Sequence, residues 1–241
     1  MKLLTTLLAA FCFAALLPAC AGQAANASVC DMPYAPVHIG ARWVYSMASQ
    51  IPTMNGTITT SILSASATSF VMQTVTSLHG VKPATVIRTT VACSNSAHDR
   101  GMLRPKSGVT IAFNSKNSFS FTNVAGTMIP PENHWVTGYS WVYVTTSKAK
   151  GYGPHANISG TVTTRMHYQV QAPVSISVPF GHFTAIPITS ITLASEDMKI
   201  NKLPITGNSM MPTTTYYYVK GIGMVKSVSP MVISELRSYT P

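Results

Sequence analysis

The sequence contains very few acidic residues. Its 241 residues include six Asp and Glu against sixteen Lys and Arg, which gives a formal net charge of +10 and only 9% charged residues, where a soluble domain usually has about 25%. The six carboxylates are scattered along the chain, so the sequence offers no carboxylate-rich metal site. Because 46% of the residues are hydrophobic, the chain can still bury a core, and its low charge does not indicate disorder.

The motifs of several enzyme classes are also absent. No G-x-S-x-G occurs, so the nucleophile turn of the α/β-hydrolases is missing. No H-E-x-x-H occurs, and no two of the seven His stand two or four positions apart, the spacing of a local zinc-binding pair. We therefore predict no catalytic residue, metal or cofactor. His98-Asp99, Glu132-x-His134 and Glu196-Asp197 resemble acid–base pairs, but we interpret them as solvated surface groups.

A long apolar run stands at the N-terminus. Residues 3–17 are almost wholly apolar and follow the basic residue Lys2. The run is shorter than the ~20 residues of a membrane-spanning helix and is typical of an export signal. Two cleavage sites compete. LPAC at 17–20 resembles the lipobox of bacterial lipoproteins, in which the Cys is lipidated, whereas Ala25-Asn26-Ala27 is a small-x-small site for soluble export.

We favour lipidation of Cys20. Acyl chains on this residue would anchor the protein to a membrane. Ala21 replaces the Asp that would resemble the inner-membrane retention signal, so we expect an outer-membrane lipoprotein facing the periplasm. A soluble periplasmic or secreted protein is the alternative. The predicted parts are a signal peptide at 1–19 (or 1–27), a tether at 20–29 and a single β domain at 30–241.

Two cysteines remain in the domain under either cleavage. Export to an oxidising compartment predicts a disulfide between Cys30 and Cys93. It would close a loop of about 63 residues and contribute about 4 kcal/mol of stability. Two free buried thiols are the alternative. A redox or metal-binding role would need a closer spacing such as C-x-x-C, which is missing.

The domain is predicted to consist of short strands. Asn55-Gly56 indicates a hairpin turn between strands at 42–49 and 57–64, and residues 157–171 alternate between apolar and polar side chains. The chain contains roughly ten to twelve such segments. We expect an all-β fold, a single curved antiparallel sheet that forms a half-barrel or open barrel. Residues 193–202, cut off by Pro204, are expected to form a loop or a single turn.

Four segments in a fixed order carry a family pattern. They are CxxPYxPxxxGxxWxY at 30–45, VPFGHFTA at 178–185, YYVKGIGMV at 217–225 and ELxSY at 235–239. Together they resemble a group of exported bacterial proteins of unknown function, many of them lipoproteins, with Gly-x-x-Trp-x-Tyr, Pro-x-Gly-x-Phe and Tyr-x-x-Gly-x-Gly-x-Val motifs. The resemblance implies a curved antiparallel sheet similar to the half-barrel of the lipoprotein-localisation factors.

A half-barrel presents a concave surface, the usual shape of a ligand site. Trp43, Tyr45 and Phe183 are expected to cover this surface, either as core residues or as the lining of a ligand site. We therefore predict a non-catalytic binding or structural module for a lipid or another hydrophobic ligand. The alternative is an envelope-acting enzyme with a site assembled from loops such as 125–138.

The positive charge suggests contact with an anionic envelope component. Nucleic acid is not an expected partner of an exported protein, and Tyr216, Tyr217 and Tyr218 cannot all face one side of a strand. An outer-membrane barrel is disfavoured because Ser and Thr interrupt both faces of strands such as 57–64. The predicted partners are therefore the membrane, through the lipid, and a hydrophobic or anionic envelope component.

Overall fold

The structure is a computed structural model that describes residues 30–93, 103–105, 110–112, 118–152 and 157–241. The predicted signal peptide, the lipidation site Cys20, the tether and His98-Asp99 lie outside the described residues. In the part of the chain that is described, no helix has both the length and the hydropathy of a membrane span.

The described chain consists almost entirely of strands. Their bounds are β1 Arg42–Ser49, β2 Gly56–Ala65, β3 Ser69–Leu78, β4 Thr85–Cys93, β5 Leu103–Pro105, β6 Thr110–Ala112, β7 Ser118–Gly126, β8 Ser140–Tyr152, β9 Asn157–Val170, β10 Val174–Val178, β11 Gly181–Ile200, β12 Leu203–Val219, β13 Gly223–Val228 and β14 Val232–Thr240. Two short 3-10 turns, η1 Pro52–Met54 and η2 Glu132–His134, complete the list.

All fourteen strands of the described residues belong to one antiparallel sheet. Its order is β5-β4-β3-β2-β1-β14-β13-β12-β11-β9-β8-β7-β6, and β10 pairs with the start of β11. Strand β14 lies between β1 and β13. The first and last strands of the chain therefore pair with each other in the middle of the sheet. The prediction of an all-β fold with a single antiparallel sheet is therefore confirmed.

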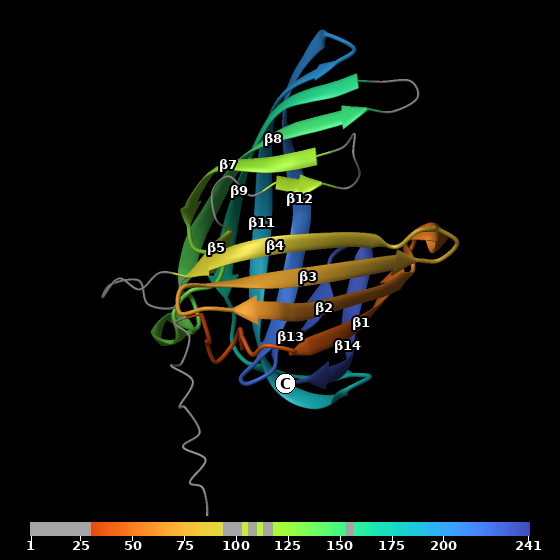
Figure 1. Ribbon diagram of the computed structural model, residues 1–241. Helices are drawn as coiled ribbons and strands as arrows, with labels where there is room; N and C mark the ends of the chain where they lie inside the picture. The colour runs from red at the N-terminus through yellow and green to blue at the C-terminus, as the bar shows by residue number, and fades with distance from the viewer. Residues whose placement is uncertain (1–29, 94–102, 106–109, 113–117, 153–156) are drawn as a thin grey trace, which may run out of the picture.

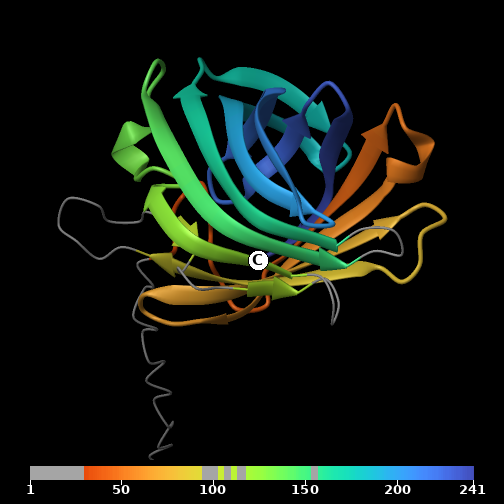
Figure 2. The same cartoon turned by 90° about the horizontal axis from the view of Figure 1, so that it is seen from above.

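The sheet is strongly curved. Strands β2, β3 and β4 cross in front of the long strands β11 and β12 (Figure 1), and the view from above shows the strands wrapping around the interior (Figure 2). The two ends of the sheet approach each other, because β4 lies beside β6 and β5 beside β7. No ladder joins the end strands among the described residues. The sheet is open, as predicted.

The expected loop at 193–202 is wrong. Strand β11 continues through these residues to Ile200, and a tight turn at Asn201 and Lys202, both with positive φ (50° and 73°), leads into β12. The tip of this hairpin projects past the crossing strands (Figure 1). Pro204 is tolerated because β12 pairs with β13 only from Thr215 onward, and a Pro on a free strand edge costs no ladder bond.

The predicted hairpin between the first two strands is present, with a longer turn. Strands β1 and β2 pair antiparallel, but η1 fills the connection. Asn55 accepts a hydrogen bond from the backbone N–H of Ser49 over 2.6 Å and does not take up the positive φ of a two-residue turn. Gly56 is needed for a different reason, because a Cβ there would collide with the carbonyl of Ser77 on β3.

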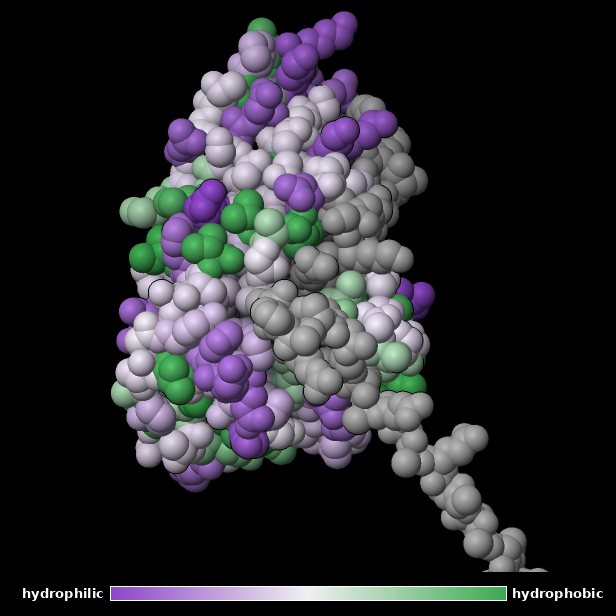
Figure 3. Space-filling view, turned by 90° about the vertical axis from the view of Figure 1, so that its left-hand side faces the viewer, coloured by the Kyte–Doolittle hydropathy of each residue, from purple (hydrophilic) through white to green (hydrophobic). Residues whose placement is uncertain are grey.

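The core fills the space between the crossing parts of the sheet. Its fully buried side chains include Val91, Val170, Val225 and Leu236. The outer surface carries little charge. On the face shown in Figure 3, pale and light purple residues predominate between scattered green ones. A surface rich in Ser and Thr accounts for the low charge content of the sequence.

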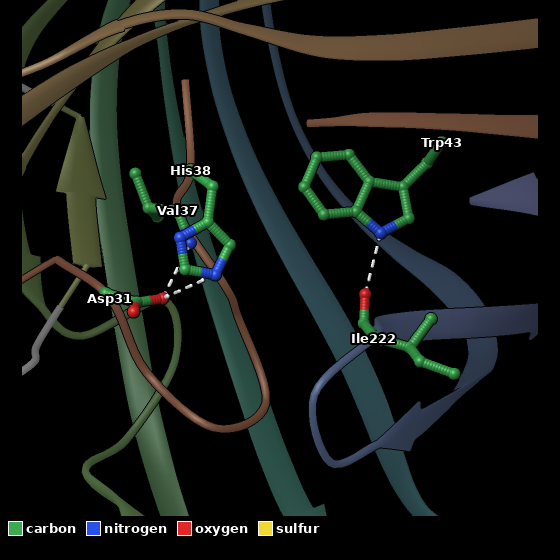
Figure 4. Close-up of polar contacts among 5 residues, drawn as sticks. All are labelled: Asp31, Val37, His38, Trp43 and Ile222. Carbon is green, nitrogen blue, oxygen red and sulfur yellow. Dashed lines mark hydrogen bonds and ion pairs between the residues drawn. The ribbon is translucent and has the colours of Figure 1, made fainter. Parts of the chain in front are cut away.

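The segment that precedes β1 is tied to the sheet. A disulfide joins Cys30 to Cys93 at the end of β4, and both side chains are buried. Within the segment, Asp31 accepts a hydrogen bond from the backbone N–H of Val37 over 2.9 Å and lies 3.8 Å from Nε2 of His38 (Figure 4). These contacts hold residues 30–41 against the interior.

Candidate ligand-binding site

Two apolar cavities adjoin in the interior of the sheet. The tyrosine cavity has a volume of about 190 Å³ and is lined by Met128, Ile129, Trp141, Tyr168, Ile188, Tyr216 and Tyr218. The N-terminal cavity has a volume of about 150 Å³ and is lined by Ala35, Pro36, Val37, Trp43, Tyr45, Thr60, Ile62, Phe70, Met72, Val91, Met128 and Ile129. Met128 and Ile129 line both cavities and therefore separate them.

The pairing of four strands brings the aromatic residues of the tyrosine cavity together. Trp141 on β8 stands opposite Tyr168 on β9, and their rings stack with centroids 5.0 Å apart. Tyr216 on β12 stands opposite Ile188 on β11. Successive side chains of a strand alternate between faces, so Tyr216 and Tyr218 share the interior face while Tyr217 takes the other.

The dividing segment, residues 127–130, is held by two indoles. Trp141 donates a hydrogen bond from Nε1 to the carbonyl of Thr127 over 3.1 Å, and Trp135 donates to the carbonyl of Pro130 over 3.0 Å. The Thr127 hydroxyl donates to the carbonyl of Ile129 over 2.7 Å. This segment belongs to the loop singled out in the sequence at 125–138, and the structure places its centre between the two cavities.

The outer part of this loop contacts the turns around it. Trp135 stacks on Tyr34 with ring centroids 4.0 Å apart and meets Tyr218 edge-on. Glu132 forms an exposed ion pair with Lys220 over 2.7 Å, and this hydrogen bond raises the pKa of Lys220. Glu132 is thus partnered by a lysine on the surface, and His134 stacks on Tyr139.

Two of the three predicted ligand-lining residues meet at the N-terminal cavity. Trp43 donates a hydrogen bond from Nε1 to the carbonyl of Ile222 over 2.7 Å (Figure 4), and Tyr45 donates from Oη to the carbonyl of Met224 over 2.8 Å. Both side chains therefore hydrogen-bond to backbone carbonyls, Trp43 in the β12–β13 connection and Tyr45 at the start of β13. The rings themselves line the cavity.

Phe183 lies elsewhere. It stands near the start of β11, stacks on Phe180 with ring centroids 6.0 Å apart and lines a shallow depression along β10 and β11. Sequence reasoning missed Trp141, Tyr168, Tyr216 and Tyr218. In the alternating segment 157–171, Tyr168 lies on the same face as the buried Val170, and that face is the interior one.

Among the described residues that line the two cavities, none is an Asp, Glu, Lys, Arg or His. Burial raises the pKa of Tyr45, Tyr168, Tyr216 and Tyr218, because the low-dielectric interior disfavours the phenolate. A tyrosine hydroxyl is already protonated at neutral pH, and burial extends this state to more alkaline pH.

The acidic residues of the long hairpin are not paired with each other. Glu196 and Asp197 are consecutive on β11, so their side chains take opposite faces. Within the described ranges, no group of three or more His, Cys, Asp or Glu is placed to hold a metal ion.

Comparisons with known proteins concern the fold. No protein-family model and no curated protein matches the sequence. A presumed exported protein of Bacteroides fragilis with a YmcC-like fold superposes with a TM-score of 0.54 and 11% identity, over 88% of this chain and 100% of that one. A presumed lipoprotein of Parabacteroides distasonis gives a TM-score of 0.46 and 11% identity, over 88% and 99%. The chain thus shares the YmcC-like fold of the Bacteroides protein.

Proposed function

We propose that the protein is a lipid-anchored envelope module that binds a hydrophobic ligand inside its β domain. The pair of apolar, uncharged cavities between the crossing parts of the sheet carries this proposal. Burial of apolar ligand surface in such a space is favourable because it removes that surface from water. The aromatic rings of Trp141, Tyr168 and Trp43 line the cavities and would contact the apolar surface of the ligand.

The cavity volumes limit the size of the ligand. Drug-sized ligand sites measure about 300–1,000 Å³, and the two cavities measure about 190 and 150 Å³. An engineered cavity of about 150 Å³ binds benzene, so each cavity suits a single ring. A longer ligand, such as an acyl chain, would have to displace Met128 and Ile129 and occupy both.

The location of the protein is part of the proposal. The apolar run at 3–17 and the lipobox-like LPAC at 17–20 support export and lipidation. The buried disulfide between Cys30 and Cys93 agrees with an oxidising compartment. We place the protein at the outer membrane, facing the periplasm, where its net positive charge would favour anionic components of the envelope.

The mass of the mature chain tests the anchor. Protein extracted with detergent from its own envelope should begin at Cys20 and carry the mass of a diacylglyceryl group, and Cys20→Ala should lack both the added mass and the membrane association. Cys12→Ala, inside the predicted signal, is the matched control and should leave the mature mass unchanged. A soluble, unmodified chain that begins at Ser28 would contradict the anchor.

The same preparation tests the ligand. In native mass spectrometry the full chain should carry a bound hydrophobic molecule that is lost after denaturation in organic solvent. Its mass would identify the ligand class directly. Repeated preparations with only the covalent mass of the protein, and no solvent-extractable molecule, would count against a binding function.

A further inference from the structure

One edge of strand β12 is unpaired over most of its length. Strand β11 pairs with β12 from Leu203 to Tyr218, whereas β13 pairs with the other edge of β12 only from Thr215 onward. Among the described residues, the edge from Leu203 to Thr214 therefore has no neighbouring strand. The backbone N–H and C=O groups of such an edge are a template on which another strand can pair.

This edge is open to solvent. All residues from 203 to 213 are exposed, whereas exposed and less exposed residues alternate on the neighbouring part of β11. The tip of the hairpin projects past the crossing strands (Figure 1). The large apolar side chains exposed on this part of β12 are Leu203, Ile205, Met210 and Met211. A partner that covers them would remove apolar surface from water, which is favourable.

The edge has little of the usual protection against pairing. Natural edge strands are commonly protected by charged side chains, by short length or by proline. Residues 203–214 contain no charged residue, and β12 is long, whereas the end strands β5 and β6 have three residues each. Pro204 and Pro212 are the exceptions. Because proline lacks the N–H that a ladder needs, they confine an added strand to residues 205–211.

The hydrogen bonds of the hairpin show which backbone groups face this edge. The N–H of Asn201 donates to the carbonyl of Asn157, the first residue of β9, over 2.8 Å. The adjacent Ile200 therefore directs its backbone groups the other way, to Leu203 on β12. Alternate residues of β12 face the same neighbour. The residues between 205 and 211 whose backbone groups face away from β11 are then Thr206, Asn208 and Met210.

The sequence of this edge is complementary to itself. When two copies pair antiparallel about a two-fold axis at Asn208, each residue stands opposite the one equally far from 208 in the other copy. Pro204 then stands opposite Pro212, so the missing donors coincide at the two ends of the ladder. A two-fold axis at residue 207 or 209 would instead leave a carbonyl of Met210 or Thr206 facing a proline without an N–H.

The same register pairs the exposed side chains. Ile205 stands opposite Met211 of the second copy on one face of the joined strands, and the axis repeats this apolar contact. On the other face Thr206 stands opposite Met210, and the Asn208 amides of the two copies adjoin, where each offers both a donor and an acceptor. No like charges oppose each other, since the segment has none.

We propose that the free edge of β12 is the interface of a homodimer, in which residues 205–211 of two copies pair antiparallel about a two-fold axis at Asn208. The two sheets then become continuous. This inference goes beyond the proposed ligand site and does not depend on it. The paired segment is short, and interfaces below about 1,000 Å² are weak or transient. A method that traps a transient dimer is therefore the appropriate test.

Disulfide trapping in the protein's own envelope tests the axis. In the full chain with Asn208→Cys, the two introduced thiols would lie at a hydrogen-bonded position, where the Cα atoms are about 5.5 Å apart, a distance that a disulfide spans. Oxidation with diamide should give a covalent dimer. Ser195→Cys is the matched control, because Ser195 is exposed and stands opposite Asn208 on β11, one strand further from the axis. It should give no more dimer than wild type.

A mixed pair tests the direction of the strands. Thr206→Cys and Met210→Cys should each give little dimer alone and should cross-link to each other when the two chains are expressed together. In sedimentation of the full chain in detergent, Asn208→Lys should weaken the dimer by about tenfold or more, because like charges would meet at the axis. Ser195→Lys should sediment like wild type.

The inference is overturned if Asn208→Cys gives no dimer, or if Ser195→Cys gives as much. Cross-linking of Thr206→Cys to itself as readily as to Met210→Cys would contradict the antiparallel register. A trapped product with a different envelope protein, in place of the dimer, would assign the edge to another partner and equally overturn the inference. Because residues 195, 206, 208 and 210 are all exposed, their variants should keep the wild-type stability in urea.

Discussion

Replacing both cysteines of the disulfide with alanine is expected to lower the free energy of unfolding by about 4 kcal/mol. The bond joins Cys30 to Cys93 and spans 63 residues. In the chain-entropy model, a cross-link of this span lowers the entropy of the unfolded chain and so stabilises the folded state by about 4 kcal/mol. The whole free energy of unfolding of a domain is about 5–15 kcal/mol, so the loss is a large share of it.

Urea unfolding of Cys30→Ala/Cys93→Ala measures this effect. A reductant is the matched control, because it should destabilise the wild type by a similar amount and leave the double variant unchanged. The substitution also frees residues 30–41, which bring Ala35, Pro36 and Val37 to the N-terminal cavity. A double variant whose stability stays within about 1 kcal/mol of the oxidised wild type would contradict the structural role of the disulfide.

Replacing Trp43 with alanine is expected to cost about 3–5 kcal/mol of stability, the usual range for a buried large aromatic residue. Trp43 is 7% exposed and stands opposite Tyr239 in the β1–β14 ladder, with the two rings stacked 5.2 Å apart. Its Nε1 also binds the carbonyl of Ile222 at the β12–β13 connection (Figure 4). One side chain thus joins three parts of the sheet.

Trp43→Phe separates the packing from the hydrogen bond. Phenylalanine keeps an aromatic ring but leaves the carbonyl of Ile222 without its donor, so we expect a smaller loss of about 1–3 kcal/mol. Phe180→Ala is the control, because Phe180 is 38% exposed and its loss should cost less. Thermal and urea unfolding of the three variants give the order. If Trp43→Ala is no less stable than Phe180→Ala, Trp43 does not hold the sheet together.

Local patterns were enough to predict the class of fold. Alternation at 157–171 and the hairpin signal at 55–56 describe strands and their neighbours along the chain, and antiparallel pairing of neighbours accounts for most of the sheet. The long hairpin of β11 and β12 was missed because Pro204 ordinarily ends a regular element. Pro204 is tolerated because it lies on a strand edge that β13 does not reach. The extent of β13 along β12 cannot be predicted from a local sequence pattern.

The candidate site was predicted only in part. Trp43, Tyr45 and Phe183 were expected on the concave face as aromatic residues of the recurring motifs, and the first two line a cavity. The tyrosine cavity needs Trp141 and Tyr216 on one interior surface, and that follows from pairings between β8, β9, β11 and β12 that span about 75 residues. The dividing segment is held by tertiary hydrogen bonds from two indoles, which sequence spacing does not reveal.

The binding of ethylbenzene, followed through the unfolding of the full chain, tests the interior site most directly. At ten times its dissociation constant, a ligand of the native state stabilises it by about 1.4 kcal/mol. Wild type and Ile39→Phe, whose residue 39 is 67% exposed, should both gain this stability. Ile129→Phe should not, because a larger side chain at residue 129 fills the space between the two cavities.

Ile188→Phe, which narrows the tyrosine cavity alone, provides a second variant if Ile129→Phe does not fold. The account predicts that ethylbenzene stabilises the wild type and Ile39→Phe fully, stabilises Ile188→Phe less because only the N-terminal cavity stays open, and does not stabilise Ile129→Phe. Equal stabilisation of all of these proteins, or no stabilisation of the wild type, would contradict a ligand site in the interior of the sheet.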